Sequence, residues 1–232
     1  MANTRLSLGN ISEFLIKEGY KMLKCYICLF FLLICSTLIA LIANAQDVPE
    51  NILQNPDFEK PTNAPWTMWV EDPNAQAVMS IDNKERIEGK QSLLIDIKKK
   101  GGGKRVELHQ NPLILKKGQK LTFAFWAKVP KDEIRDAKMI VNHRADPWTS
   151  YMFKNITIKW EWTEFFNTFT MSADDNIAGV YIELIDNPGQ IWFDHFRLYE
   201  GNYIEENLGE KGSKSVDVKN KLTSTWAKIK TL

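Results

Sequence analysis

Cysteine is nearly absent from the sequence, and its placement is informative. The chain of 232 residues has three cysteines, and all three lie within one apolar run at residues 25–45. The remaining residues therefore have no disulfides, no thiolate chemistry and no cysteine-bound zinc. Their stability has to come from burial of a hydrophobic core, and their number is sufficient for one domain of roughly 150 residues.

An excess of charge of either sign is also missing. The chain has 30 basic and 29 acidic residues and a formal net charge of +1. This balance gives it no electrostatic reason to bind nucleic acid or an anionic membrane surface. The densest basic stretch, residues 98–104, reads KKKGGGK and is typical of a solvated turn between two strands.

Signatures of the common enzyme classes are missing as well. The three histidines show no zinc-binding spacing, and neither a G-x-S-x-G sequence nor a phosphate-binding loop occurs. Glu107 and Glu183 would flank a glycosidic bond only if their strands were neighbours. The sequence therefore favours a non-catalytic protein. A small polysaccharide lyase or hydrolase, whose turnover would disappear on Glu183→Gln, stays open as an alternative.

The single long apolar run lies near the N-terminus. Residues 25–45 carry no charge, follow two nearby lysines and end in Ala-Asn-Ala before a polar segment. This pattern predicts a secretory signal peptide, which begins at Met1 or, for a leader of ordinary length, at Met22. An uncleaved membrane anchor is the alternative, because the run has about the 20 residues that span a bilayer. We therefore expect a secreted, extracellular protein or one attached to a membrane through residues 25–45.

The middle of the chain shows short apolar–polar alternations that turn residues separate. Val180 and Ile182, for example, face one side of a strand, and Tyr181 and Glu183 face the other. Little helical periodicity is present, so the pattern predicts an all-β sandwich. Strands are predicted at residues 66–71, 77–82, 91–98, 104–110, 120–129, 137–143, 151–158, 162–171, 178–185 and 190–199.

One acidic residue interrupts the alternation of the last predicted strand. In residues 190–199, Trp192, Phe196 and Leu198 are expected on one face, and Asp194 falls on that same face. A carboxylate that points into a core costs several kcal/mol unless a cation or strong donors meet it. Asp194 therefore needs a partner.

The expected partner lies far upstream, in residues 55–59. This segment reads NPDFE, supplies Asp57 and Glu59, and is predicted to form a strand beside the last one. Hard oxygen ligands from two distant segments suit Ca²⁺, and a structural ion would join both ends of a cysteine-free sandwich. The alternative is that these carboxylates only cap turns and accept hydrogen bonds from backbone N–H groups.

Several short motifs occur in an order that resembles a known family. They are N-x-D-F-E at 55–59, tryptophan at 66, E-G-K-Q-S-L at 88–93, L-K-K-G-Q-K-L-T-F-A-F-W-A-K at 115–128, W-T-E-F at 162–165 and I-W-F-D-H-F-R-L at 191–198. The series resembles carbohydrate-binding modules of the family 4/9 and 22 type over residues 51–200. The resemblance implies a jelly-roll sandwich with a galactose-binding-like fold. It also implies a structural calcium ion, held by Glu59, Lys90 and Asp194, and Asp57 completes the predicted metal set.

The faces opposite the apolar ones mix aromatic and polar side chains, as sugar-binding surfaces do. Aromatic rings cover the C–H faces of sugars, and polar side chains bond the hydroxyls. In the resembling modules the ligand lies in a groove across a concave sheet, and a Tyr-x-Glu pair contributes in some of them. The candidate ligand-binding residues are Trp69, Glu107, His109, Trp126, Asn142, Arg144, Tyr181 and Glu183. Trp148 and Tyr151 could join them, and Arg144 would suit an acidic or sulfated sugar.

The composition changes again after Gly201. Residues 202–220 are polar, and residues 221–232 could form a short amphipathic helix. We therefore expect a leader or anchor at 1–45, a sandwich at 46–200, and a polar linker with a short amphipathic segment at 201–232. The predicted function is a secreted, monomeric, non-catalytic module that binds a polysaccharide or glycan. An adhesion or structural sandwich that binds a protein partner is the alternative.

Overall fold

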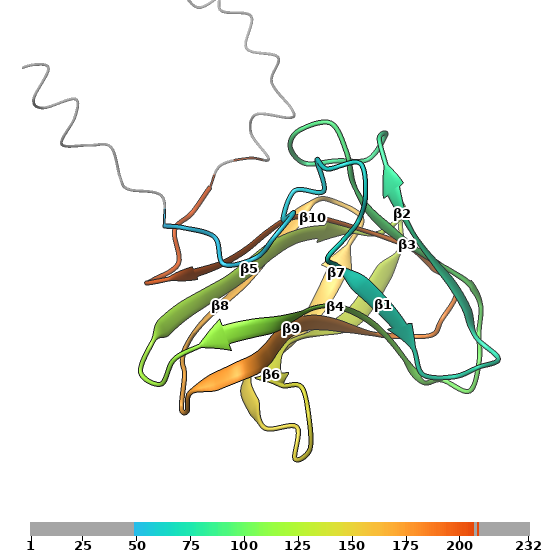
Figure 1. The fold of residues 1–232 in the computed structure, drawn as a ribbon. Coiled ribbons are helices and arrows are strands. Elements are labelled where there is room, and N and C mark those ends of the chain that lie inside the picture. The colour runs from blue at the N-terminus through green and yellow to red at the C-terminus, as the bar shows by residue number, and fades with distance from the viewer. Residues whose placement is uncertain (1–48, 207, 209–232) are drawn as a thin grey trace, which may run out of the picture. The chain divides into compact units, whose positions relative to one another are not determined.

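The fold is built from strands. The computed structural model describes residues 49–206 and residue 208. Its strands are β1 (Thr67–Val70), β2 (Gln76–Asp82), β3 (Ser92–Lys99), β4 (Arg105–Leu115), β5 (Lys120–Lys128), β6 (Ile134–His143), β7 (Ser150–Lys159), β8 (Thr163–Thr170), β9 (Asp175–Ile185) and β10 (Gly189–Glu200). Each corresponds to a predicted strand, with ends that differ by a few residues. The all-β prediction is confirmed (Figure 1).

The strands form two antiparallel sheets. The first sheet has the order β1-β4-β9-β6-β7, and the second has the order β2-β3-β10-β5-β8. In Figure 1 the second sheet forms the upper layer, with β10 and β5, and the first forms the lower layer, with β4 and β9. Sequence neighbours often lie in opposite sheets, as in a jelly-roll sandwich. In the described residues no helix has the length and apolar character to cross a membrane. The predicted leader at 1–45 lies outside them.

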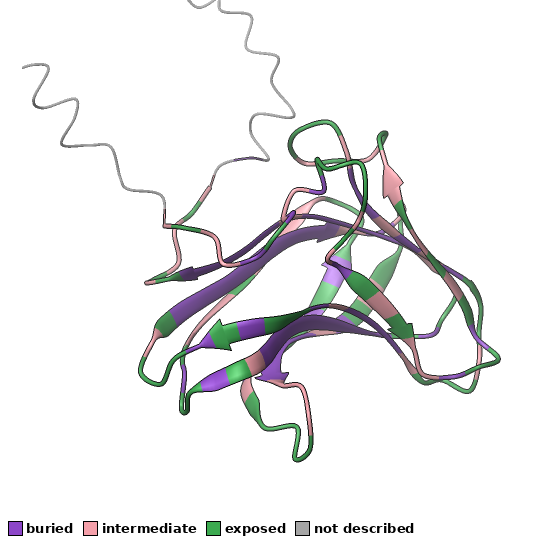
Figure 2. Cartoon of the chain, in the orientation of Figure 1, coloured by how far each residue is buried: buried purple, intermediate pink, exposed green. Residues whose placement is uncertain are grey.

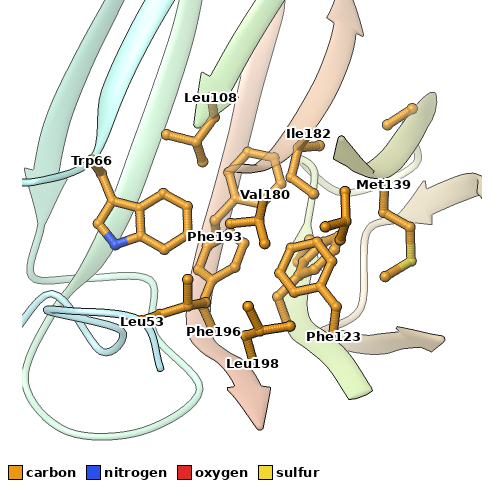
Figure 3. Packing of buried hydrophobic residues seen from close by; sticks show 14 of the residues in the cluster. Leu53, Trp66, Leu108, Phe123, Met139, Val180, Ile182, Phe193, Phe196 and Leu198 are labelled. Atoms are coloured by element: carbon orange, nitrogen blue, oxygen red, sulfur yellow. The ribbon is translucent and has the colours of Figure 1, made fainter. Parts of the chain in front are cut away.

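The core lies between the sheets and is formed by the alternating apolar residues. Val180, Ile182 and Leu184 of β9 are fully buried against side chains of the second sheet. Figure 2 shows the resulting alternation of buried and exposed positions along the strands. Figure 3 shows Phe193, Phe196 and Phe123 of the second sheet beside Val180 and Ile182 of the first.

The face assignment of β10 needs a correction. The pairing of β10 with β5 shifts between Asp194 and Arg197, and His195 has a φ of 50°. This β-bulge changes the phase of the alternation, since one extra residue moves the following side chains to the other face. Phe193 and Phe196 both enter the core, whereas Trp192 lies outside it. The simple alternation predicts that Trp192 and Phe196 share a face, and this prediction is wrong.

The segment at residues 55–59 is not the predicted strand. It forms a turn in which Phe58 has a φ of 54° and is fully buried in the core. The segment does lie beside β10, since the amide of Phe196 donates to the carbonyl of Pro56 at 3.0 Å. The two ends of the fold are therefore neighbours, as expected, but through loop contacts and not through a shared ladder.

The fold also continues past the predicted boundary at residue 200. The Thr122 hydroxyl donates to the carbonyl of Gly201 at 2.9 Å, and the amide of Ile204 donates to the Tyr199 hydroxyl at 2.8 Å. The rings of Phe166 and Tyr203 stack with centroids 3.6 Å apart. Residues 201–206 thus pack on the second sheet and are not part of a linker. The predicted helix at 221–232 lies outside the described residues.

Candidate functional site

A cavity opens on the outer face of the first sheet. Its volume is about 540 Å³. It is lined by Trp69, Arg105, Glu107, His109, Asn142, Arg144, Trp148 and Tyr181. The strand register explains the grouping, because Trp69 pairs with Glu107 and His109 pairs with Tyr181 across β1, β4 and β9. Side chains of paired residues project to the same face of a sheet.

Six of the eight predicted ligand-binding residues line this cavity. Glu183 lies beside it, as the register partner of Glu107. Trp126 does not line the cavity, because β5 belongs to the second sheet, where Trp126 pairs with Asp194 and is buried. The expectation that Trp126 shares a face with Tyr181 is therefore wrong. Alternation distinguishes the two faces of each strand, but it does not tell which sheet the strand joins.

The cavity also contains Arg105, which was not among the predicted site residues. The sequence could have indicated this residue, because strand alternation places Arg105 on the same face as Glu107 and opposite to Val106. The Arg105 guanidinium lies 5.3 Å from the centre of the Trp69 ring, and its Nε donates to Glu71 Oε2 at 2.9 Å. This hydrogen bond is the largest of the effects that raise the pKa of Arg105.

An ion pair crosses the floor of the cavity. Arg144 donates to Glu107 Oε1 at 2.6 Å, and both side chains are largely buried. The guanidinium lies 5.0 Å from the ring centre of Tyr181 and 5.7 Å from that of Trp148. A Cβ at Gly179 would approach Arg144 Cγ to 2.9 Å, so only glycine at this position of β9 leaves room for the arginine side chain. Arg144 is thus fixed by a carboxylate and two aromatic rings.

One wall of the cavity is an exposed tryptophan on a tight loop. Trp148 is 55% exposed and has a φ of 58°. A positive φ is unusual for a bulky residue and costs of order 1–3 kcal/mol. Its amide donates to the carbonyl of Ala145 at 2.6 Å, which closes the loop. The ring is therefore held at the rim and is available to a ligand on its outer side.

Two polar atoms of the cavity have no partner in the described part of the chain. They are Oδ1 of Asn142, a residue that is 3% exposed, and Nδ1 of His109. His109 Nε2 lies 2.7 Å from the Thr67 hydroxyl, while Nδ1 is 3.4 Å from Glu107 Oε1. Burial lowers the pKa of His109, although Glu107 partly opposes this effect. A buried polar group without a partner is costly, so a rotation of either side chain that brings this atom to a ligand's hydroxyl group would be favourable.

A second hollow of about 380 Å³ lies farther across the same sheet. It is lined by Asp136, Ala137, Lys138, Asn155, Ile156, Thr157, Glu183 and Ile185. Lys138 donates to Glu183 Oε1 at 2.7 Å. The register runs without interruption from the first cavity to the second: Trp69 pairs with Glu107, Glu107 with Glu183, Glu183 with Lys138, and Lys138 with Asn155. One row of polar and aromatic side chains therefore crosses all five strands.

Two of the predicted metal ligands hold the ends of one loop, residues 87–91. Glu59 Oε1 accepts hydrogen bonds from the amides of Lys90, at 2.7 Å, and Gln91, at 3.2 Å. Gly89, which precedes Lys90 in this loop, has a φ of 61°, and a Cβ at this position would clash with the Glu59 carboxylate. The loop and the carboxylate therefore fit each other only with glycine at this position.

Asp194 is fully buried and binds the other end of this loop. Its Oδ2 accepts from the amides of Ile87 at 3.0 Å and Glu88 at 3.4 Å, and its Oδ1 accepts from the amide of His195 at 2.8 Å. Burial raises the pKa of Asp194 to about 7 in spite of these three donors. The carboxylate thus has strong donors but no cation from the described residues.

Asp57 contacts the imidazole ring of His195. Its Oδ1 lies 3.0 Å from Nδ1 of His195, which is also 3.1 Å from Glu88 Oε2, while Nε2 of the same ring lies 2.5 Å from Glu206 Oε2. Burial opposes the charge of this ring, but hydrogen bonds to Asp57 and Glu206 outweigh it and raise the pKa of His195 to about 10. In the described residues no three His, Cys, Asp or Glu side chains are grouped to hold a metal. A cation here would depend on Glu59, Asp194 and backbone carbonyls.

The fold is an antiparallel two-sheet sandwich, and the aromatic and polar groove on one outer face is suited to bind a ligand with both C–H and hydroxyl groups. The sequence comparison agrees. A family model described as carbohydrate binding domain, CBM_4_9, matches residues 50–189, and the chain belongs to this family. No curated protein matches the sequence.

Solved structures share the fold at low sequence identity. A structure titled for CBM4 structure and function is 21% identical, with a TM-score of 0.53, and the match covers 64% of this chain and 99% of that one. The CBM22-1 xylan-binding domain of Paenibacillus barcinonensis Xyn10C is 15% identical, with a TM-score of 0.51 and coverage of 69% and 100%. The enzymatically active domain of bacteriophage CBA120 tailspike protein 4 is 12% identical, with a TM-score of 0.52 and coverage of 65% and 21%. These likenesses concern the fold.

Proposed function

We propose that this chain is a non-catalytic domain that binds a neutral, linear polysaccharide along the outer face of its first sheet. The observation that carries the proposal is the cavity itself. It combines the exposed rings of Trp69 and Trp148 with the unpartnered polar atoms of Asn142 and His109. Rings that cover C–H faces and buried groups that need hydroxyl partners are the two requirements of sugar recognition.

Binding is favoured over hydrolysis by the partners of the two carboxylates. Glu107 and Glu183 face each other across β4 and β9, as a pair of catalytic carboxylates would. Each, however, is held by a cation: Glu107 by Arg144 and Glu183 by Lys138. A catalytic carboxyl group has to be free to contact the reacting bond, whereas both of these groups are held by side chains of the protein.

The ion pairs of the two arginines in the cavity favour a neutral sugar. Arg144 is bonded to Glu107 and Arg105 to Glu71, so neither guanidinium is free in the described structure. An acidic or sulfated sugar would have to displace a carboxylate before an arginine could bind it. Sugar hydroxyls, by contrast, can donate to Glu107 and accept from Arg144 without breaking the pair. These contacts therefore favour a neutral ligand over the acidic or sulfated sugar that Arg144 alone predicts.

The extent of the groove favours a polymer. The two hollows lie on one face and are joined through Glu183 and the row of register partners. Five strands spaced about 4.8 Å apart span roughly 19 Å, which is longer than a single sugar ring. We infer that internal segments of a chain lie across the strands, with one part against Trp69 and another near Lys138.

A pair of tryptophan variants tests the proposal. Trp69→Ala should lower the affinity for the bound glycan about fivefold or more, because an aromatic platform is worth roughly 1–3 kcal/mol in comparable stacking sites. Trp160→Ala is the matched control, since Trp160 is 44% exposed against 43% for Trp69 but does not line the cavity. The measurement is calorimetry with neutral oligosaccharides of increasing length, after a glycan array has identified the sugar. If no glycan binds, or if both variants bind as the unchanged protein does, the proposal is wrong.

We also propose that a structural Ca²⁺ is held by Glu59, Asp194 and the carbonyl of Lys90, as predicted from the sequence. This proposal is supported by the convergence of both carboxylates on loop 87–91 and by the absence, among the described residues, of an ion pair at buried Asp194. Such an ion would supply positive charge and fix the first turn, this loop and β10 to one another. Secretion through residues 25–45 stays a prediction and would expose the site to extracellular calcium.

Removal of calcium should lower the melting temperature. An ion at 100 times its Kd adds about 2.7 kcal/mol, and for a chain of this size that corresponds to roughly 5–10 °C. Thermal melts with a chelator and in roughly 10 mM Ca²⁺, which is 100 times a Kd of about 0.1 mM, measure the effect. Asp194→Asn should remove the sensitivity, whereas the control Asp96→Asn on β3 should keep it. Equal melting temperatures with and without chelator would contradict the proposal.

A further inference from the structure

Three loops meet at one end of the first sheet, outside both sites described above. They are residues 71–75 after β1, residues 100–104 before β4 and residues 186–188 after β9. The amide of Glu71 donates to the carbonyl of Arg105 at 3.0 Å, and that of Asp186 donates to the carbonyl of Lys104 at 2.9 Å. The middle loop contains the Gly101-Gly102-Gly103 turn.

Two buried aspartates close around this turn. Asp186 is fully buried and Asp72 is 8% exposed. The amide of Gly101 donates to Asp186 Oδ2 at 2.9 Å, and that of Gly102 donates to Asp72 Oδ2 at 2.6 Å. A Cβ built on Gly101 would lie 2.6 Å from Asp72 Cγ and 2.8 Å from Asp186 Oδ2. Both carboxyl groups therefore approach one point, and the glycine leaves room for them.

One carboxylate oxygen of these two aspartates has no hydrogen-bond partner among the described residues. Asp186 Oδ1 is buried and makes no hydrogen bond with the described residues. Neither aspartate forms an ion pair within 4.0 Å in that part of the chain. Hydrogen bonds from the amides of Asn74 and Gly102 hold the pKa of Asp72 below its usual value, so that it stays ionised. Two adjacent buried carboxylates with a free oxygen need positive charge.

We propose that Asp72 and Asp186 form a second cation site, for a hard divalent ion of the Ca²⁺ type. The donors are carboxylate oxygens from two of the three converging loops, and Ca²⁺ accepts such oxygens in irregular geometry together with backbone carbonyls and water. Only two carboxylates contribute charge, so the affinity should lie in the weak range of extracellular modules, with a Kd on the order of 0.1–1 mM. The site shares no residue with the one at Glu59 and Asp194.

The position of this site links it to the cavity. The three loops extend directly from β1, β4 and β9, which are adjacent in the sheet and carry Trp69, Glu107 and Tyr181. Glu71, next to Asp72, binds Arg105, which lies over the Trp69 ring. A cation between the loops would therefore steady the wall of the groove that contains Trp69.

Direct binding of the metal tests the inference. Equilibrium dialysis with radioactive ⁴⁵Ca²⁺, at concentrations up to the millimolar range, is applied to the full chain carrying Asp194→Asn, which removes the first proposed site. One weakly bound Ca²⁺ per chain is expected. Adding Asp186→Asn or Asp72→Asn should abolish it, and adding Asp96→Asn should not. Thermal melts of all variants show that each is folded.

A second measurement does not depend on an aspartate variant at the site. Hydrogen exchange of the amides in residues 98–104 should slow several-fold when millimolar Ca²⁺ is added to the Asp194→Asn protein, since the turn becomes fixed. No bound Ca²⁺ in that protein, or exchange that is unchanged by Ca²⁺, would overturn the inference. Binding that survives both Asp186→Asn and Asp72→Asn would overturn it as well.

Discussion

Phe196→Ala is expected to lower the free energy of unfolding by about 3–5 kcal/mol. The Phe196 ring is fully buried and has five aromatic neighbours, whose centroids lie 4.3–6.2 Å away. These neighbours are Phe58, Trp66, Phe123, Phe125 and Phe193. The ring connects the first turn with β5 and β10 (Figure 3). Alanine would leave a cavity that the surrounding rigid rings cannot fill. The free-energy cost of this cavity adds to the cost of the lost apolar burial.

The measurement is unfolding in urea, with Phe153→Ala as control. Phe153 lies on β7 and is 52% exposed, so its replacement should cost under about 1 kcal/mol. Trp192→Ala adds a second comparison, because Trp192 lies outside the core cluster although it too is on β10. If Phe196→Ala cost no more than Phe153→Ala, the bulge in β10 and the placement of Phe196 would be wrong.

The bulge shows where prediction from the sequence ends. Strand positions follow from local alternation and turn residues, and all ten strands lie where these predicted them. The phase of β10 depends on a positive φ at His195, a residue that favours this conformation only weakly. Its ring is instead held by Asp57, which lies 138 residues upstream, and by Glu206, which lies beyond the end of the strand. A long-range cause of this kind leaves no mark in the sequence of β10 itself.

The candidate site was predictable to a similar degree. Alternation placed Glu107 and His109 on one face of β4 and Tyr181 on one face of β9, and each strand has a clear apolar opposite face. It could not tell that β4 and β9 pair in one sheet while β5, with Trp126, pairs in the other. Sheet membership follows from connections between strands far apart in the chain. The ion pair of Arg144 with Glu107 was hidden for the same reason.

Arg144→Met is expected to have the largest effect on the groove. Glu107 is 3% exposed, and the loss of Arg144 would leave its charge buried without its cation. Breaking a buried pair in this way costs about 3–5 kcal/mol. Both stability and glycan affinity should fall, since Tyr181 and Trp148 also lose the guanidinium that packs between them. Urea unfolding and calorimetry with the same oligosaccharides measure the two effects.

The double variant Arg144→Met, Glu107→Gln separates stability from recognition. Without the carboxylate charge, the buried site no longer needs a cation, so most of the stability should return. Affinity for the glycan should not return, because the hydroxyls still lack the charged donor and acceptor that the pair presents. If binding recovers together with stability, Arg144 and Glu107 only support the fold. If stability recovers alone, the ion pair on the floor of the cavity contacts the sugar directly and contributes to its recognition.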